Sequence, residues 1–68
     1  MPRKLMRLQV KAGFVTLARA AEVSVDIKDE KDLREAIEKI ADRHGRKGHN
    51  GIRGRFYDGK RFVKEVRL

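Results

Sequence analysis

Hydrophobic and polar residues alternate at the start of the chain. Between Leu5 and Ala12 every second residue from Met6 onward is apolar, and Arg7 and Lys11 are among the residues between them. A period of two places successive side chains on opposite faces of an extended strand. This segment is therefore predicted to be a strand with one buried face.

A second strand is predicted around Val23, Val25 and Ile27, which alternate with polar residues. Residues 14–21 give a mixed signal, because their first half is rich in residues that favour strands and their second half is rich in alanine. We expect an extended start there, followed by a short irregular connection to the second strand.

A helix is predicted from Asp29 to His44. Asp29 is a favourable N-cap, the acidic residues after it suit the positive end of a helix, and Gly45 is a suitable stop. Apolar residues recur with the helical spacing i, i+3, i+4, i+7 and i+8, which predicts one buried stripe. The stripe consists of Leu33, Ala36, Ile37, Ile40 and Ala41.

The last part of the chain is predicted to be a loop and a hairpin. Residues 45–51 show no periodicity, whereas residues 53–57 and 60–68 resemble strands. Asp58-Gly59 separates these two runs, and an Asp-Gly pair in this position favours a hairpin turn.

The element order strand, strand, helix, strand, strand predicts an α+β fold. The economical arrangement packs one amphipathic helix on one face of a four-stranded sheet. We expect a β-grasp-like ββαββ fold with a mixed sheet, with other ββαββ sandwiches as competitors. At 68 residues the chain is predicted to form a single domain, residues 1–68.

Composition excludes several classes of site. The sequence contains no cysteine, which rules out disulfides and thiolate metal sites. Nothing resembles a signal peptide or a membrane span, so a cytoplasmic protein with no membrane partner is expected. The oligomeric state is left open.

The formal net charge of +8 is unevenly distributed. Residues 1–19 carry five basic and no acidic side chains, residues 22–42 have a net charge of −4, and residues 43–61 have a net charge of +6. This predicts a basic side and an acidic side. A concentrated cationic segment that carries aromatic residues favours an anionic partner, and nucleic acid is the first candidate.

The basic segment supplies the predicted binding site. Between Arg43 and Arg61 the sequence has seven Lys or Arg, five Gly and one acidic residue. We predict a non-catalytic module that holds DNA or RNA through this loop and the hairpin that follows, with Tyr57 stacking on a base. At least one of Phe56, Tyr57 and Phe62 is expected in the core. The predicted nucleic-acid-binding residues are Arg46, Lys47, His49, Arg53, Arg55, Tyr57, Lys60 and Arg61.

Other chemistries are weaker interpretations. Residues 45–48 match the GxxG loop of KH domains, but Gly51 and Gly54 disfavour the helix that should follow such a loop. His44 continues the apolar stripe and is predicted to pack at the edge of the core, whereas His49 lies in the loop. No further metal ligands and no pair of nucleophile and base stand out. We therefore predict no enzyme, no metal and no cofactor.

Three blocks, residues 14–21, 29–45 and 52–63, resemble in order the small β-grasp sulfur carriers of molybdopterin and thiamine biosynthesis. The resemblance implies a β-grasp fold. Those carriers end in Gly-Gly, which is activated at its carboxylate, whereas this sequence ends in Arg67-Leu68. The alternatives to nucleic-acid binding are therefore a ubiquitin-like module with a protein partner and a truncated or lapsed sulfur carrier.

Overall fold

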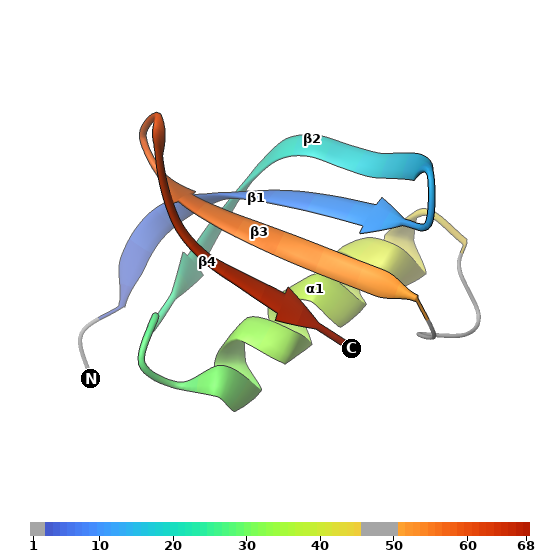
Figure 1. Cartoon of the computed structure of the whole chain (residues 1–68). Helices are drawn as coiled ribbons and strands as arrows, with labels where there is room; N and C mark the ends of the chain where they lie inside the picture. Colours follow the sequence, from blue (N-terminus) through green and yellow to red (C-terminus); the bar gives the residue numbers. More distant parts are fainter. Residues whose placement is uncertain (1–2, 46–50) are drawn as a thin grey trace.

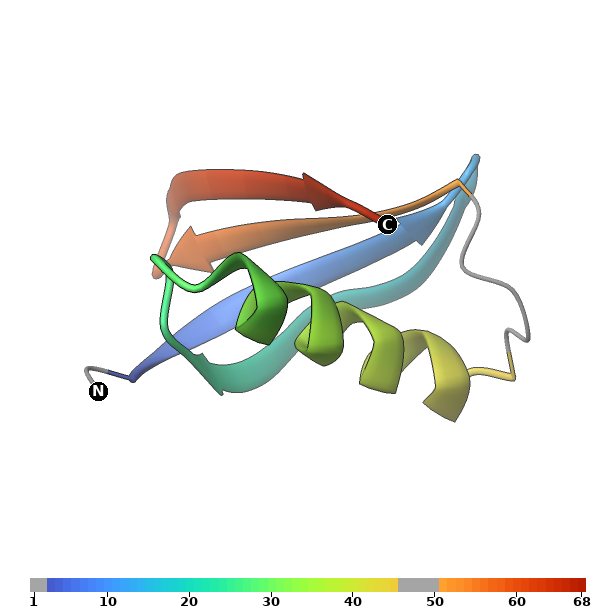
Figure 2. The same ribbon diagram turned by 90° about the horizontal axis from the view of Figure 1, so that it is seen from below.

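The computed structural model describes residues 3–45 and 51–68, which form a four-stranded sheet with one helix against it (Figure 1). Figure 2 shows that the helix lies on one side of the sheet only and leaves the other face open. The elements in chain order are β1 (Lys4–Ala12), β2 (Val15–Val25), α1 (Glu30–Arg43), β3 (Ile52–Asp58) and β4 (Arg61–Arg67).

The strand order in the sheet is β2-β1-β3-β4, and every neighbouring pair is antiparallel. The α+β class with one helix on four strands is confirmed, but the predicted mixed sheet is wrong and the β-grasp arrangement is not confirmed. The sheet is antiparallel because the chain, after α1, enters β3 beside β1. The strands β2 and β3 run in the same direction but lie on either side of β1, so they never pair, and the following hairpin adds β4 at the outside.

The second strand is longer than predicted and begins directly after the first turn. Residues 15–21 belong to β2 and are not an irregular connection, whereas Ile27 lies beyond the strand and only packs against the core. The pairing with β1 shifts register twice, between Leu8 and Val10 and between Val10 and Lys11. These bulges insert extra residues into the alanine-rich part of β2, so pairing with β1 overrides the local helical preference.

The helix matches its prediction closely. Asp29 is the N-cap, and its carboxylate accepts hydrogen bonds from the backbone N–H groups of Lys31 at 3.1 Å and Asp32 at 3.4 Å. The expected packing of His44 at the edge of the core is wrong, because the helix ends at Arg43. His44 is the C-cap, its N–H donates to the carbonyl groups of Ile40 and Ala41, and its side chain is exposed.

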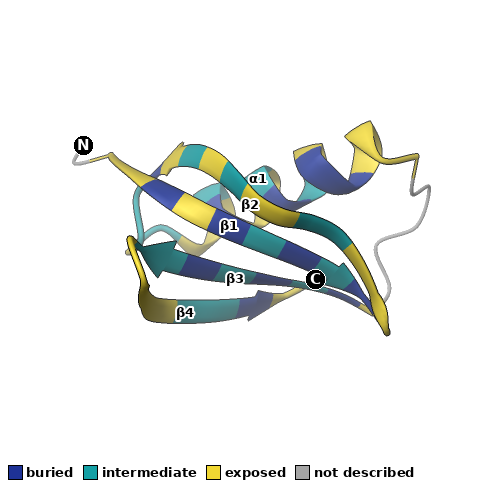
Figure 3. Cartoon of the chain, turned by 90° about the horizontal axis from the view of Figure 1, so that it is seen from above, coloured by how far each residue is buried: buried dark blue, intermediate teal, exposed yellow. Residues whose placement is uncertain are grey.

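The core lies between the helix and one face of the sheet, and it follows the two periodicities of the sequence. Along β1 every second residue from Met6 to Ala12 is buried, which appears as alternating stripes in Figure 3. Phe56 is fully buried and is the aromatic anchor of the core. The largest fully buried side chains are Phe56, Leu8, Leu33, Ile37, Ile52, Val10 and Val25.

Both hairpins use a two-residue loop that begins with glycine. Ala12 pairs with Val15, so Gly13 and Phe14 form the first loop. In the second, Asp58 pairs with Arg61, so the loop is Gly59-Lys60 and is shifted by one residue from the predicted Asp58-Gly59. Both glycines have positive φ, at 62° and 64°, which suits the first position of a type II′ turn. Phe14 is fully exposed at its hairpin tip.

Candidate nucleic-acid interface

The open face of the sheet carries the polar half of each alternating strand. Arg7, Gln9 and Lys11 of β1 point away from the helix, because their neighbours in the strand are buried beneath it. The register places each of them opposite one residue of β3 on the same face, which are Tyr57, Arg55 and Arg53 in that order. The face is therefore organised in rows that run across the strands.

The row nearest the first hairpin contains three cations and no acid. Lys11 is paired with Arg53, and Arg53 is paired with Arg67 of β4. Side chains directly opposite one another in an antiparallel sheet have Cβ atoms roughly 4.5–5.5 Å apart, and like charges at that distance are destabilising. In the part of the chain that the structure describes, neither Lys11 nor Arg53 forms an ion pair. This row carries excess positive charge that an anion would stabilise.

The middle row holds the carboxylate of Glu65, which lies between Arg55 of the same row and Arg67 of the first row. The Nε atom of Arg55 donates to Glu65 Oε1 at 3.0 Å, and Arg67 Nε lies 3.8 Å from Glu65 Oε2. The hydrogen bond from Arg55 lowers the pKa of Glu65, so this carboxylate stays ionised in mildly acidic solution. The bond to Glu65 also raises the pKa of Arg55. Glu65 therefore offsets part of the positive charge but does not cancel it.

The third row combines a cation with two aromatic rings. Arg7 lies opposite Tyr57 of β3 and, on its other side, opposite Glu22 of β2. Tyr57 is in turn paired with Phe62 of β4. The two rings meet edge to face with their centroids 5.6 Å apart and an angle of 67° between them. A register shift in β4 next to Tyr57 brings Phe62 opposite it. Tyr57 is half-buried and Phe62 is 52% exposed, so an aromatic surface remains open at this end.

The hairpin residues divide between the two faces. Lys60 lines a shallow hollow of about 310 Å³ together with Arg7, Arg19 and Tyr57, so it belongs to the open face. Arg61 does not, because its pairing with Asp58 gives it the opposite orientation to Tyr57 and Phe62. It lines a different groove of about 450 Å³ on the helix side of the sheet, over Met6 and Val25.

Four of the predicted site residues therefore lie on or beside one face: Arg53, Arg55, Tyr57 and Lys60. Arg46, Lys47 and His49 lie outside the described residues, so the predicted basic loop is not tested. Sequence reasoning missed Arg7, Lys11 and Arg67, which join the face through pairing between strands. The signal for them was present in the alternation of β1, whose outward positions are polar.

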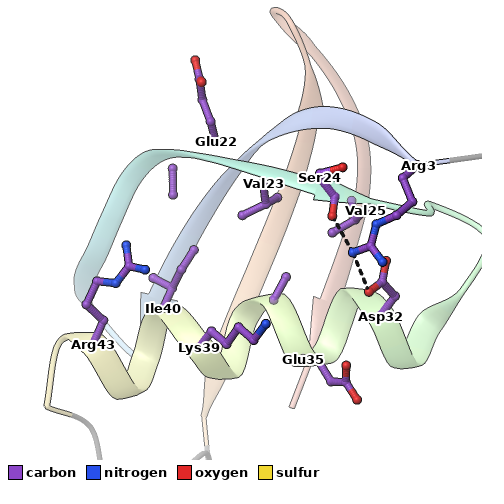
Figure 4. Close-up of a pocket in the computed structure, with 12 residues that line it drawn as sticks. Arg3, Glu22, Val23, Ser24, Val25, Asp32, Glu35, Lys39, Ile40 and Arg43 are labelled. Atoms are coloured by element: carbon purple, nitrogen blue, oxygen red, sulfur yellow. Dashed lines mark hydrogen bonds and ion pairs between the residues drawn. The ribbon is translucent and has the colours of Figure 1, made fainter.

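A hollow between β2 and α1 has a different electrostatic character (Figure 4). Its volume is about 230 Å³, and the residues that line it include three basic and three acidic ones, although the side chain of Glu22 points away from α1. One of these cations, Arg3, donates to the Ser24 carbonyl at 2.8 Å and to Asp32 Oδ1 at 3.2 Å. The basic and acidic residues of this hollow are equal in number, and Arg3 already binds β2 and α1. This hollow is therefore a weaker candidate for an anionic ligand.

The helix layer does not share the excess of positive charge. Five acidic and four basic residues lie on α1. The rows of the open face, by contrast, hold five cations from three strands. The carboxylates in these rows are Glu65 and Glu22, which is paired with Arg7. The cations of these rows are Arg7, Lys11, Arg53, Arg55 and Arg67.

Comparison of the chain with protein-family models, with curated proteins and with solved structures found no match. The resemblance to sulfur carriers therefore stays a prediction from sequence. Among residues 3–45 and 51–68, no group of three or more His, Asp or Glu side chains is arranged to hold a metal ion. No helix in the same ranges is long and apolar enough to cross a membrane.

Proposed function

We propose that the protein is a non-catalytic nucleic-acid-binding module that uses the open face of its sheet. The observation that carries this proposal is the row Lys11, Arg53 and Arg67, in which three cations lie side by side on neighbouring strands. Folding brings these like charges together at a cost in electrostatic energy. A polyanion that crosses the row neutralises them and releases its own counterions.

The neighbouring rows supply contacts for the bases of a nucleic acid, in addition to the contacts for its phosphates. Tyr57 and Phe62 present aromatic surface next to Arg7 and Lys60, and bases stack on such surfaces whatever their sequence. Phosphate contacts position a nucleic acid without reading its sequence. The proposed module therefore binds with little sequence preference and with a strong dependence on salt.

The salt dependence of binding tests the proposal. The dissociation constant of a labelled oligonucleotide is measured by fluorescence anisotropy at several salt concentrations for the parent and for the double variant Lys11→Ala/Arg53→Ala. Each phosphate contact contributes about 0.7–0.9 to the slope of log K against log salt. Loss of two contacts is expected to reduce this slope by about one to two, with a similar effect on every oligonucleotide sequence.

The matched control is Lys31→Ala/Arg34→Ala, which removes the same charge from exposed positions on α1. It is expected to leave the slope nearly unchanged. If no oligonucleotide binds even at low salt, or if the helix variant reduces the slope as much as the sheet variant, the open face is not a nucleic-acid site.

A further inference from the structure

Aromatic side chains lie near both ends of the strands that form the open face. Tyr57 and Phe62 lie at the end near the β3–β4 hairpin. At the other end Phe14 forms the tip of the β1–β2 hairpin, where its side chain is fully exposed. The hydrogen bond from Gly13 N–H to the Gly51 carbonyl, 3.3 Å long, joins this tip to the start of β3.

Cations lie beside each aromatic end. Arg7, Arg19 and Lys60 surround the hollow next to Tyr57. Arg53 and Arg67 line a second hollow of about 310 Å³, to which Gly13 of the Phe14 hairpin also contributes. Each end therefore combines aromatic surface for a base with positive charge for the adjoining phosphates.

The shape of the face distinguishes between single and double strands. Neighbouring strands are about 4.8 Å apart, so four strands with their side chains are wider than the major groove of B-DNA, which is about 12 Å wide and admits a helix or a two-stranded ribbon. The open face cannot reach base edges inside a duplex, and bases paired inside a duplex are covered on both faces by their neighbours, so they offer no surface to Tyr57 or Phe14. Unpaired bases can lie flat on both.

We infer that the ligand is a single-stranded nucleic acid that runs across the open face from Tyr57 to Phe14, with an unpaired base stacked at each end. This inference rests on the function proposed above and deepens it. Tyr57 lies in the row of Arg7, six residues along β1 from Gly13. At a rise of about 3.3 Å per residue the two ends are roughly 20 Å apart. A stacked strand that advances about 3.4 Å per nucleotide covers this with roughly six nucleotides, and an extended strand needs fewer.

A series of oligonucleotide lengths tests the inference. Oligo(dT) and oligo(U) of two to ten nucleotides are titrated at low salt and followed by the fluorescence of Tyr57, which is the only tyrosine in a chain without tryptophan. Stacking of a base on the ring is expected to quench this emission. Affinity should rise with length up to about six nucleotides and then level off, because by then both aromatic ends are occupied. The two series also distinguish RNA from DNA as the preferred strand.

The variant Phe14→Leu keeps an apolar side chain at the tip but removes the ring, and its full exposure means that the core is unaffected. It is expected to weaken the binding of oligonucleotides of six or more nucleotides about fivefold or more, which corresponds to the lower end of the free energy of stacking one base. The binding of the shortest oligonucleotides should be unchanged. Phe14→Tyr should restore the parent affinity. Tyr57 quenching at saturation should persist in Phe14→Leu, in which Tyr57 remains the only tyrosine.

Two results would overturn the inference while leaving the proposed function in place. One is a blunt-ended duplex that binds as tightly as a single strand of the same length, and the other is Phe14→Leu with parent affinity at every length. A total absence of binding, in contrast, would refute the proposed function itself and this inference with it.

Discussion

At Gly54 the sheet lies close against the helix, and the substitution Gly54→Ala tests how tightly the two layers pack. A Cβ atom added there would fall inside van der Waals distance of Ile37 Cγ1 and Cδ1, and 3.1 Å from Leu8 Cδ1. Both side chains are fully buried, so neither can turn toward solvent to make room. Gly54 also lies between Arg53 and Arg55, the two cations that β3 places on the open face.

Two opposing terms decide the size of the effect. Overpacking a filled core costs about 1–3 kcal/mol. Alanine in place of glycine recovers roughly 0.5–1 kcal/mol, because it restricts the unfolded chain. We expect a net loss of about 1–2 kcal/mol, against a total free energy of unfolding of roughly 3–10 kcal/mol for a chain of this size. The melting temperature should fall by roughly 5–15 °C.

Urea denaturation followed by circular dichroism measures this loss, and a double-mutant cycle identifies its cause. Ile37→Val removes Cδ1, which is one of the two Ile37 atoms that meet the new Cβ, so the double variant should be more stable than the sum of the two single effects predicts, by about 0.5 kcal/mol or more. Ile40→Val is the control, since Ile40 is buried on the same helix but is not among the nearest atoms. If Gly54→Ala is as stable as the parent, or if Ile40→Val couples to it as strongly as Ile37→Val, the close packing described here is wrong.

Three further predictions concern the carboxylates of Asp29 and Glu65. Asp29→Ala removes the N-cap of α1 and should cost about 1 kcal/mol in urea denaturation, whereas Asp29→Asn should cost less. Glu65→Gln takes away the carboxylate that binds Arg55 and should tighten oligonucleotide binding at low salt; weaker binding would contradict the role given to this face. Because Arg55 lowers the pKa of Glu65, the contribution of the pair to stability is present above the ordinary pKa of 4.5 and is lost as the pH falls through the lowered value. Glu65→Gln should therefore lessen the loss of stability in acid, as measured by denaturation at pH 3 and pH 7.

The elements that depend on local pattern could be predicted from the sequence. The alternation in β1, the N-cap at Asp29 and the stripe on α1 all specify local structure, and all match. The path of β2 could not be predicted, because its alanine-rich half is held in a strand by pairing with β1 and by two bulges. Strand order also depends on contacts between distant parts of the chain, which is why an antiparallel sheet replaced the expected mixed one.

The candidate site shows the same division. Sequence reasoning grouped cations by their distance along the chain, so it collected Arg61 with Arg53 and Arg55. In the fold, alternation places Arg61 on the other face, and the register brings in Lys11 and Arg67 from two other strands. The chemistry of the face could thus be predicted from its residue types, but which residues lie on it could be known only from the pairing of the strands.

The most direct test of the open face as a nucleic-acid site is to map the contact by nuclear magnetic resonance. Backbone amide shifts are recorded while an unlabelled eight-nucleotide single strand is added at low salt. We expect the largest changes at Arg7 and Lys11 of β1 and at Arg53 and Arg55 of β3, with little change along α1. Changes concentrated on α1, or no changes at any residue at low salt, would contradict the account.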